Sequence, residues 1–254
     1  MTPTDRRGAL RAGAAAALAG AVTAACGTDR RPADPPSAAA PAEPAAAPVP
    51  RRFPGRPTEI DHGPRDRARV ALTFHGQGDP AVARALLTAA ERAGARLTVL
   101  AVGDWLDRYP DLARRILDGG HDLGNHTQRH VDINAMTEAQ AYAEINACAQ
   151  RLRRLTGSIG TWFRPSRAPH ALPHVQRAAA RAGYPHVLGY EVDSLDFTSP
   201  GAPAVVRNVT GPIRNGSVVS LHLGYADTVA ALPALLADLD RRGLRAVTTT
   251  ELLT

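Results

Sequence analysis

The chain has 254 residues, of which 44% are hydrophobic, so it is long enough for one large domain with tails. Its formal net charge is +6 and its isoelectric point is near 10.1, a balance that would ordinarily indicate an anionic partner. The sequence contains no lysine, its arginines are spread along apparent helices, and no recognised nucleic-acid-binding motif accompanies them. We therefore expect no nucleic-acid partner.

The N-terminal residues 1–26 read as a targeting segment. Arg6 and Arg7 precede an alanine-rich apolar run that ends at Cys26 and is too short and too weakly apolar to span a membrane. Paired arginines before such a run fit a twin-arginine export signal, and small residues leading into a cysteine are similar to a lipoprotein cleavage site. We expect an exported protein, lipid-anchored through Cys26 on the outer face of the cytoplasmic membrane or otherwise secreted. The alternative is an alanine-rich surface helix with a stray cysteine.

Residues 27–65 consist largely of alanine, proline and a few charged residues. Such a segment buries too little apolar surface to offset its ordering entropy, which predicts a disordered, extended tether. The folded domain is then expected at 66–254. The other cysteine, Cys148, lies in an amphipathic helical pattern and is predicted to be a small buried residue.

The domain alternates strand-like and helix-like segments. Predicted strands lie in 69–74, 96–103, 121–127, 161–165, 186–194, 216–224 and 244–253, and predicted helices in 81–93, 105–118, 138–155, 173–182 and 227–242. Regular alternation implies a parallel sheet covered by helices. Seven strands favour an incomplete barrel over an eightfold one, and the lack of G-x-G-x-x-G after a strand disfavours a nucleotide-binding domain.

Polar and titratable residues follow several of these strands. Because active sites of parallel architectures assemble at the carboxyl ends of strands, we expect these residues at one rim. They are His75, His126, His130, Arg164, Asp193, Asp196 and His222.

Two H-x-x-x-H pairs occur in the sequence. His126 and His130 follow a strand end, where two imidazoles at this spacing can bind one zinc ion if the chain turns between them. The second pair, His170 and His174, lies between prolines at a helix start, and we favour the first pair as the metal site.

Other rim residues allow two interpretations each. His222 ends an apolar strand and is either a general acid or base or a satisfied core histidine. Arg164 and Asp196 either form a buried ion pair or set the protonation state of neighbouring catalytic groups. Asn125 reads as a turn residue rather than a ligand.

Together these stretches resemble the polysaccharide deacetylases of the NodB-homology type, carbohydrate esterase family 4, over about residues 69–253. The sequence "HDLGNHTQRH" is similar to the strand that carries the family's H-[ST]-x-x-H zinc ligands. Arg164-Pro165 resembles the R-P-P motif with Ser166 for the second proline, and Asp193 to Asp196 resembles D-x-x-D-W with Phe197 for tryptophan. The strand "SVVSLH" resembles the one that ends in the family's acidic histidine.

The resemblance implies a distorted (β/α)₇ barrel and hydrolysis of an acetamido group on a sugar of a peptidoglycan-like or chitin-like glycan. It implies a divalent metal, zinc above all, held by His126 and His130, with His222 protonating the leaving amine. Arg164 resembles the residue that orients the base, and Asp196 the one that tunes the acidic histidine.

The opening motif departs from the family pattern T-F-D-D-G, in which the first aspartate is the base and the second a metal ligand. Here His75 and Gly76 occupy those positions, so both carboxylates are missing. Either His75 completes a three-histidine metal site, or His75 acts as base while Asp79 becomes a ligand. The leading prediction is a metal-dependent deacetylase of a cell-envelope glycan. The alternative is a catalytically impaired, glycan-binding lipoprotein with the same barrel.

Overall fold

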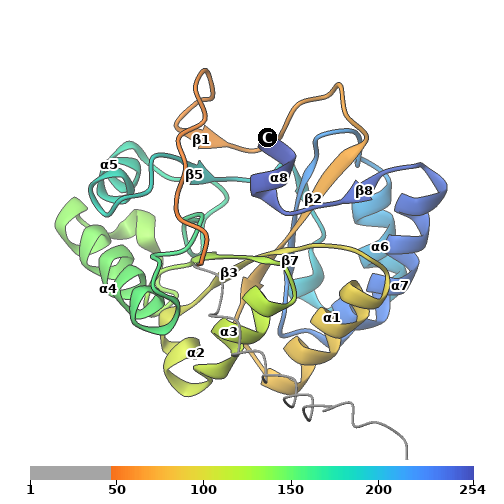
Figure 1. The fold of residues 1–254 in the computed structure, drawn as a ribbon, viewed down its shortest axis with the longest axis horizontal. Helices are drawn as coiled ribbons and strands as arrows, with labels where there is room; N and C mark the ends of the chain where they lie inside the picture. The colour runs from red at the N-terminus through yellow and green to blue at the C-terminus, as the bar shows by residue number, and fades with distance from the viewer. Residues whose placement is uncertain (1–46) are drawn as a thin grey trace, which may run out of the picture. The chain divides into compact units, whose positions relative to one another are not determined.

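A parallel sheet forms the centre of the computed structural model, which describes residues 47–254 (Figure 1). Its strands are hydrogen-bonded in the order β4-β3-β2-β7-β6, and every pairing among them is parallel. Their bounds are β2 (Arg69–Gly76), β3 (Thr98–Ala101), β4 (Asp122–Asn125), β6 (Val192–Asp193) and β7 (Val218–His222).

The sheet curves into the expected distorted barrel. Phe163 forms parallel bridges to both Asn125 of β4 and Val187 of β5 (Val187–Leu188), so it stands as a one-residue strand between them. After β5 the chain continues into β6, and β6 pairs with β7, the neighbour of β2. The succession of strands around the barrel thus leads back to β2. Two short strands complete the arrangement: β1 (Glu59–Ile60) pairs with β5, and β8 (Arg245–Ala246) pairs with the start of β2. The (β/α)₇ prediction is confirmed.

Helices cover the outside of the sheet (Figure 1). They are α1 (Pro80–Arg92), α2 (Gly103–Arg108), α3 (Asp111–Asp118), α4 (Glu138–Thr156), α5 (Pro173–Arg181), α6 (Ala202–Thr210), α7 (Ala226–Arg241) and α8 (Thr249–Leu253). Helix α4 starts with a capping box between Thr137 and Gln140 and ends at Gly157, whose φ of 81° suits glycine. Among the residues described, no helix is long and apolar enough to cross a membrane.

The alternation of β2 sets the direction of His75. Val70, Leu72 and Phe74 are fully buried in the main core cluster between sheet and helices. Successive side chains of a strand point to opposite faces, so Thr73 and His75 lie on the inner side of the barrel. The apolar pattern of this strand is thus what places an imidazole inside the barrel mouth.

Several predicted elements differ from the structure in type or extent. The strand expected at 186–194 is the two strands β5 and β6, and the one expected at 161–165 is reduced to the bridging residue Phe163. The helix expected at 105–118 is two helices, because Pro110 lies between α2 and α3 and has no N–H to continue the first. The last residues, 249–253, form α8 instead of a strand, because Thr248 and Glu251 make a capping box that starts a helix there. Helix α6 had no counterpart among the predicted elements.

Residues 47–65 belong to the folded domain, which corrects the tether predicted for 27–65. The Phe53 ring stacks on Trp162 with centroids 5.4 Å apart and planes 8° from parallel. The Phe53 amide donates to His186 Nε2 at 3.0 Å, and β1 pairs with β5. One aromatic contact and a short strand anchor a segment whose composition is otherwise typical of disorder. The predicted signal, Cys26 and the rest of the tether lie outside the described residues.

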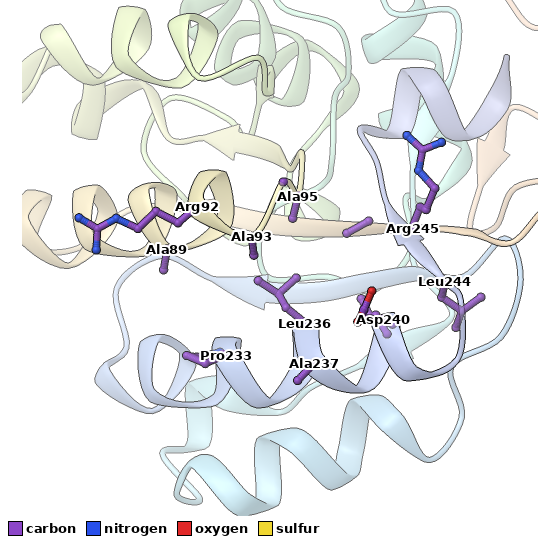
Figure 2. Close-up of a pocket in the computed structure, with 13 residues that line it drawn as sticks. Ala89, Arg92, Ala93, Ala95, Pro233, Leu236, Ala237, Asp240, Leu244 and Arg245 are labelled. Atoms are coloured by element: carbon purple, nitrogen blue, oxygen red, sulfur yellow. The ribbon is translucent and has the colours of Figure 1, made fainter.

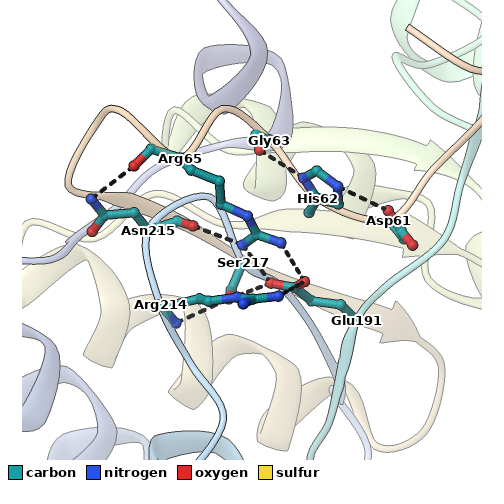
Figure 3. A network of polar contacts seen from close by, with 8 residues as sticks. All are labelled: Asp61, His62, Gly63, Arg65, Glu191, Arg214, Asn215 and Ser217. Atoms are coloured by element: carbon teal, nitrogen blue, oxygen red, sulfur yellow. Dashed lines mark hydrogen bonds and ion pairs between the residues drawn. The ribbon is translucent and has the colours of Figure 1, made fainter.

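An ionic network fixes the loop that leads into β2 (Figure 3). The Arg65 guanidinium donates to both carboxylate oxygens of Glu191, at 2.8 and 2.6 Å, and Ser217 Oγ donates to the same carboxylate at 2.6 Å. These contacts lower the pKa of Glu191 to about 2, chiefly through the hydrogen bond from Arg65. The loop is thereby tied to the starts of β6 and β7.

Candidate functional site

Four histidine rings gather at the carboxyl ends of the strands. His75 at the end of β2 is the register partner of His222 at the end of β7, and their ring centroids are 4.3 Å apart. His126 directly follows β4, with its ring 4.4 Å from that of His75 and 4.9 Å from that of His130. The structure thus brings together every histidine that the sequence analysis placed at this rim.

His222 forms a dyad with Asp196. Its Nδ1 lies 2.7 Å from Asp196 Oδ1, while its backbone N–H donates to Oδ2 of the same carboxylate at 2.8 Å. Thr228 Oγ1 also donates to Oδ2, at 2.6 Å, and the Asp196 side chain is fully buried. A carboxylate that accepts from Nδ1–H fixes the imidazole orientation and leaves Nε2 for chemistry in the cleft.

His126 is oriented by the neighbouring segment. Its Nδ1 lies 3.0 Å from the carbonyl oxygen of Arg164, which can only accept, so Nδ1 carries the proton. The remaining nitrogen, Nε2, is buried and has no hydrogen-bond partner in the described structure, and the same holds for His75 Nε2. A histidine that donates through one nitrogen and offers the lone pair of the other has the arrangement of a metal ligand.

Burial favours the neutral form of His75, His126 and His130 by lowering their pKa values. The pKa values of His75 and His126 lie well below the usual value, first because of burial and then because of neighbouring imidazoles and Arg164. The pKa of His130 is lowered by burial and by Arg167. Unprotonated imidazole is the form that binds a metal ion.

Arg164 is buried without a carboxylate partner. Its Nε donates to the Leu188 carbonyl at 3.0 Å and its Nη2 to the Gly189 carbonyl at 2.8 Å, while Nη1 has no partner among the described residues. Burial lowers its pKa to about 10. The ion pair with Asp196 that the sequence allowed does not form, because Asp196 is engaged by His222 and Thr228.

Local hydrogen bonds show what the side chains of Asp79 and Asn125 do, the two residues that the sequence analysis considered as possible ligands. Asp79 caps α1, where its carboxylate accepts from the Ala81 amide at 2.7 Å, so the helix start occupies it. Asn125 donates through Nδ2 to the Ile145 carbonyl and to the Tyr184 hydroxyl, which makes it a structural residue of the turn before His126.

The remaining histidine pair is not part of the cluster. His170 Nδ1 lies 2.9 Å from Glu59 Oε1, and His174 belongs to α5. The second H-x-x-x-H pair therefore lies apart from the four rings at the strand ends.

The donor set fits a metal ion in its chemistry. Within residues 47–254, no three His, Cys, Asp or Glu side chains converge closely enough to hold an ion as they stand. The buried, unpartnered Nε2 atoms of His75 and His126 nevertheless supply two free lone pairs next to His130. An all-imidazole set suits zinc and similar transition ions and disfavours magnesium or calcium.

A cleft of about 710 Å³ opens over the histidines. His75, His130 and His222 line it together with the aromatic residues Tyr190, Phe197 and Tyr225. The Phe197 and Tyr225 rings both lie 5.6 Å from that of His222, edge to face. The sequence analysis did not identify Tyr190 or Tyr225 as site residues. Their positions just after β5 and β7 could have indicated that they lie at the carboxyl ends of the strands.

A second hollow, of about 730 Å³, lies between α1, α7 and β8 (Figure 2). Alanine and leucine side chains line most of it, with Arg92, Asp240 and Arg245 as its charged members. None of the four histidines lines this second hollow. The candidate active site is therefore the cleft that His75, His130 and His222 line.

Sequence comparison identifies relatives over most of the domain. The profile of the polysaccharide deacetylase family matches residues 62–187. A peptidoglycan-N-acetylglucosamine deacetylase of Bacillus cereus is 30% identical over 75% of this chain and 90% of its own length. A chitooligosaccharide deacetylase of a Bradyrhizobium species is 29% identical over 68% of this chain and 85% of its own length.

Solved structures share the fold. A peptidoglycan N-acetylglucosamine deacetylase superposes with a TM-score of 0.72 at 25% identity, over 77% of this chain and 92% of that one. A family 4 carbohydrate esterase pseudoenzyme of Bacillus anthracis superposes with a TM-score of 0.73 at 21% identity, over 78% and 70% of the two chains, a likeness of fold alone. The barrel, its motifs and these relatives lead to one conclusion: the chain belongs to the polysaccharide deacetylase family.

Proposed function

We propose that this protein is an exported, metal-dependent deacetylase that removes acetyl groups from N-acetylated sugars of a cell-envelope polysaccharide. The observation that carries the proposal is the cluster of His75, His126 and His130 beside the Asp196–His222 dyad. Named relatives act on peptidoglycan and on chitooligosaccharides, which supports a glycan substrate. A module that only bound sugar would have no need of this combination of buried groups.

His126, His130 and His75 would hold the ion, which we take to be zinc because the donor set is all imidazole. His75 takes the third place in this proposal because its Nε2 is buried without a partner and its ring lies against that of His126. Its lowered pKa keeps it in the unprotonated form at neutral pH. When bound, such an ion activates a water molecule and polarises the acetyl carbonyl.

The dyad handles the proton of the leaving group. Water adds its oxygen to the acetyl carbon, the carbon–nitrogen bond breaks, and acetate and the sugar amine are the products. As the water oxygen adds, His222 Nε2 takes one proton of the water, and Asp196 stabilises the resulting imidazolium through Nδ1–H. His222 then gives this proton to the amine nitrogen as the carbon–nitrogen bond breaks, and the remaining hydroxyl leaves with the acetyl group as acetic acid, which ionises to acetate. Tyr190, Phe197 and Tyr225 offer faces and edges against which a sugar ring can pack.

Acetate release tests the proposal. The full chain, loaded with zinc, is expected to release acetate from chitooligosaccharides or from peptidoglycan fragments. His126→Ala and His75→Ala should lose both bound zinc and activity. The control is His62→Ala, which removes a histidine whose ring contacts Gly63 and Asp61, far from the cluster in the fold. Zinc near one per wild-type chain without any acetate release would overturn the catalytic part.

The second candidate is a glycan-binding protein without catalysis. It is favoured by the missing carboxylates at His75 and Gly76 and by the lack of three converged ligands in the described structure. In that case His75→Ala would leave glycan binding intact, and neither the wild type nor any variant would release acetate.

The proposed location rests on the sequence of the N-terminus. We infer an anchor at Cys26 following a twin-arginine signal, so that the barrel works outside the cytoplasmic membrane. Incorporation of radiolabelled palmitate into the wild type, and its loss in Cys26→Ser, would support the anchor. Equal labelling of both would overturn it.

A further inference from the structure

A hydroxyl relay joins the loop of the two histidines to the segment after Arg164. Ser166 Oγ donates to the carbonyl oxygen of Val131 at 2.5 Å and accepts from Thr127 Oγ1 at 3.0 Å. Thr127 Oγ1 in turn accepts from the backbone N–H of His130 at 3.2 Å. One serine thus holds both the beginning and the end of the 126–131 loop.

The relay lies in a place that water cannot reach. The side chains of Ser166 and Thr127 are both fully buried, so neither hydroxyl can replace these hydrogen bonds with bonds to solvent. Ser166 also stands where the resembling family pattern has its second proline. Proline has no hydroxyl and could not form either bond.

The loop needs such support because its backbone is strained. Thr127 has a φ of 67° and His130 a φ of 55°, both in the left-handed region that a β-branched or bulky residue rarely adopts. Contacts from outside the loop must therefore hold it. Besides the relay, His126 Nδ1 donates to the Arg164 carbonyl, and the Arg164 amide donates to the Asn125 carbonyl at 3.0 Å.

We propose that Ser166 is a positioning residue that holds the imidazoles of His126 and His130 in their ligand arrangement. The inference rests on the proposed function, because the two imidazoles need a fixed arrangement only if they bind an ion. This chain lacks the carboxylates of the family pattern, so an ion gains less from charge and more from a loop that already holds His126 and His130 next to each other. Ser166 contributes that order without touching the ion.

Zinc affinity of the full chain, measured by calorimetry, tests this in Ser166→Ala. We expect it to weaken about 10–100-fold, the range for groups that orient metal ligands. Substitution with cobalt adds a spectroscopic signature, since a loosened ligand set changes the intensity of the visible bands. Ser166→Pro, which restores the family residue, should weaken zinc binding as much as Ser166→Ala.

Ser158→Ala is the matched control. Ser158 is also a buried serine, donating to the Pro48 carbonyl at 2.6 Å and accepting from the Gly160 amide at 3.1 Å, but it lies at the other end of the barrel. It should leave the zinc affinity and the cobalt spectrum unchanged. Equal losses in both variants, or none in Ser166→Ala, would overturn the proposal.

Two further measurements keep the test decisive. If Ser166→Ala fails to fold, Thr127→Val removes the same relay, and an affinity equal to that of the wild type overturns the proposal. If the wild type itself binds no zinc, the metal in the proposed function is wrong. Hydrogen exchange of the His130 amide in the metal-free chain then decides. Faster exchange in Ser166→Ala than in Ser158→Ala supports the positioning role of Ser166, and equal rates overturn it.

Discussion

The two ends of the barrel differ in how they treat buried polar groups. At the end where the strands begin, Asp122 accepts from the Thr250 amide and hydroxyl at 3.0 and 2.7 Å, and Thr98 Oγ1 accepts from the Thr249 amide at 2.8 Å. At the end where the strands finish, His75 Nε2, His126 Nε2 and Arg164 Nη1 are buried without partners.

Backbone strain follows the same division. Within the described residues, the non-glycine residues in the left-handed region all lie in loops around the histidines: Thr127, His130, Arg167, Leu195 and Ser199. Strained dihedrals cost stability, and so do the unpaired atoms of His75, His126 and Arg164, although α4, α5 and α7 also carry buried atoms without a hydrogen-bond partner, at Arg151, His174 and Asp238. The strained backbone and the unpaired imidazoles therefore mark the end of the barrel that carries the chemistry.

The largest effect is expected for Asp196→Asn at the chemical end. The amide cannot accept from His222 Nδ1–H and Thr228 as the carboxylate does, so acetate release should fall roughly 10²–10⁴-fold, the scale of general acid catalysis. Zinc affinity should not change. Asp193→Asn is the control, since Asp193 lines the cleft without bonding His222. Equal losses in the two variants would argue against a dyad.

Asn125→Ala should destabilise the turn before His126, at the same end of the barrel. It removes the hydrogen bonds that Asn125 donates to the Ile145 carbonyl and the Tyr184 hydroxyl and the one that it accepts from the Thr127 amide, which we expect to cost about 2–4 kcal/mol in urea unfolding. Tyr184→Phe, which removes only the neighbouring hydroxyl, should cost less. A neutral Asn125→Ala would mean that the turn before His126 is held by other contacts.

Gly76→Asp tests whether the second aspartate of the family pattern can be restored at the end of β2. A Cβ at this position would lie 3.0 Å from both the backbone Cα of Ala101 and Cγ1 of Val99. We expect a loss of roughly 1–3 kcal/mol of stability and no gain in zinc affinity. Tighter zinc binding with unchanged unfolding would show that the end of β2 rearranges freely.

Acid titration probes the end where the strands begin, through Glu191. Its pKa of about 2 lies below the usual value, so the stability from its contact with Arg65 is fully present above about pH 4.5 and is lost as the pH falls toward 2. We expect a loss of about 1–3 kcal/mol, discounted because Arg65 is 35% exposed. Urea unfolding of Glu191→Gln over the same range should show a flatter dependence, and parallel curves would contradict the assignment.

Much of the site could be predicted because it follows strands with clear patterns. The alternation of β2 and the apolar run of β7 locate His75 and His222, and parallel pairing brings them together. What the sequence did not reveal depends on contacts between distant segments. Ser166 reaches Thr127 and Val131 across the loop, and nothing near residue 166 indicates that partnership.

The tether prediction is wrong for residues 47–65 because one side chain outweighs the average composition of the segment. The composition of 27–65 favours disorder on average, yet Phe53 alone supplies an apolar ring that finds Trp162 more than 100 residues away. In the same way, the short C-terminal helix depended on a capping box that a strand-like composition concealed.

The stacked Phe53 and the pairing of β1 with β5 also determine where the domain can be cut. A shortened chain that starts at residue 66 would lose both, baring the face of Trp162 and leaving β5 with an unpaired edge. Open edges next to apolar surface are templates for pairing with another molecule. Such a chain is expected to self-associate during expression, whereas one that starts at residue 47 keeps its own edge covered.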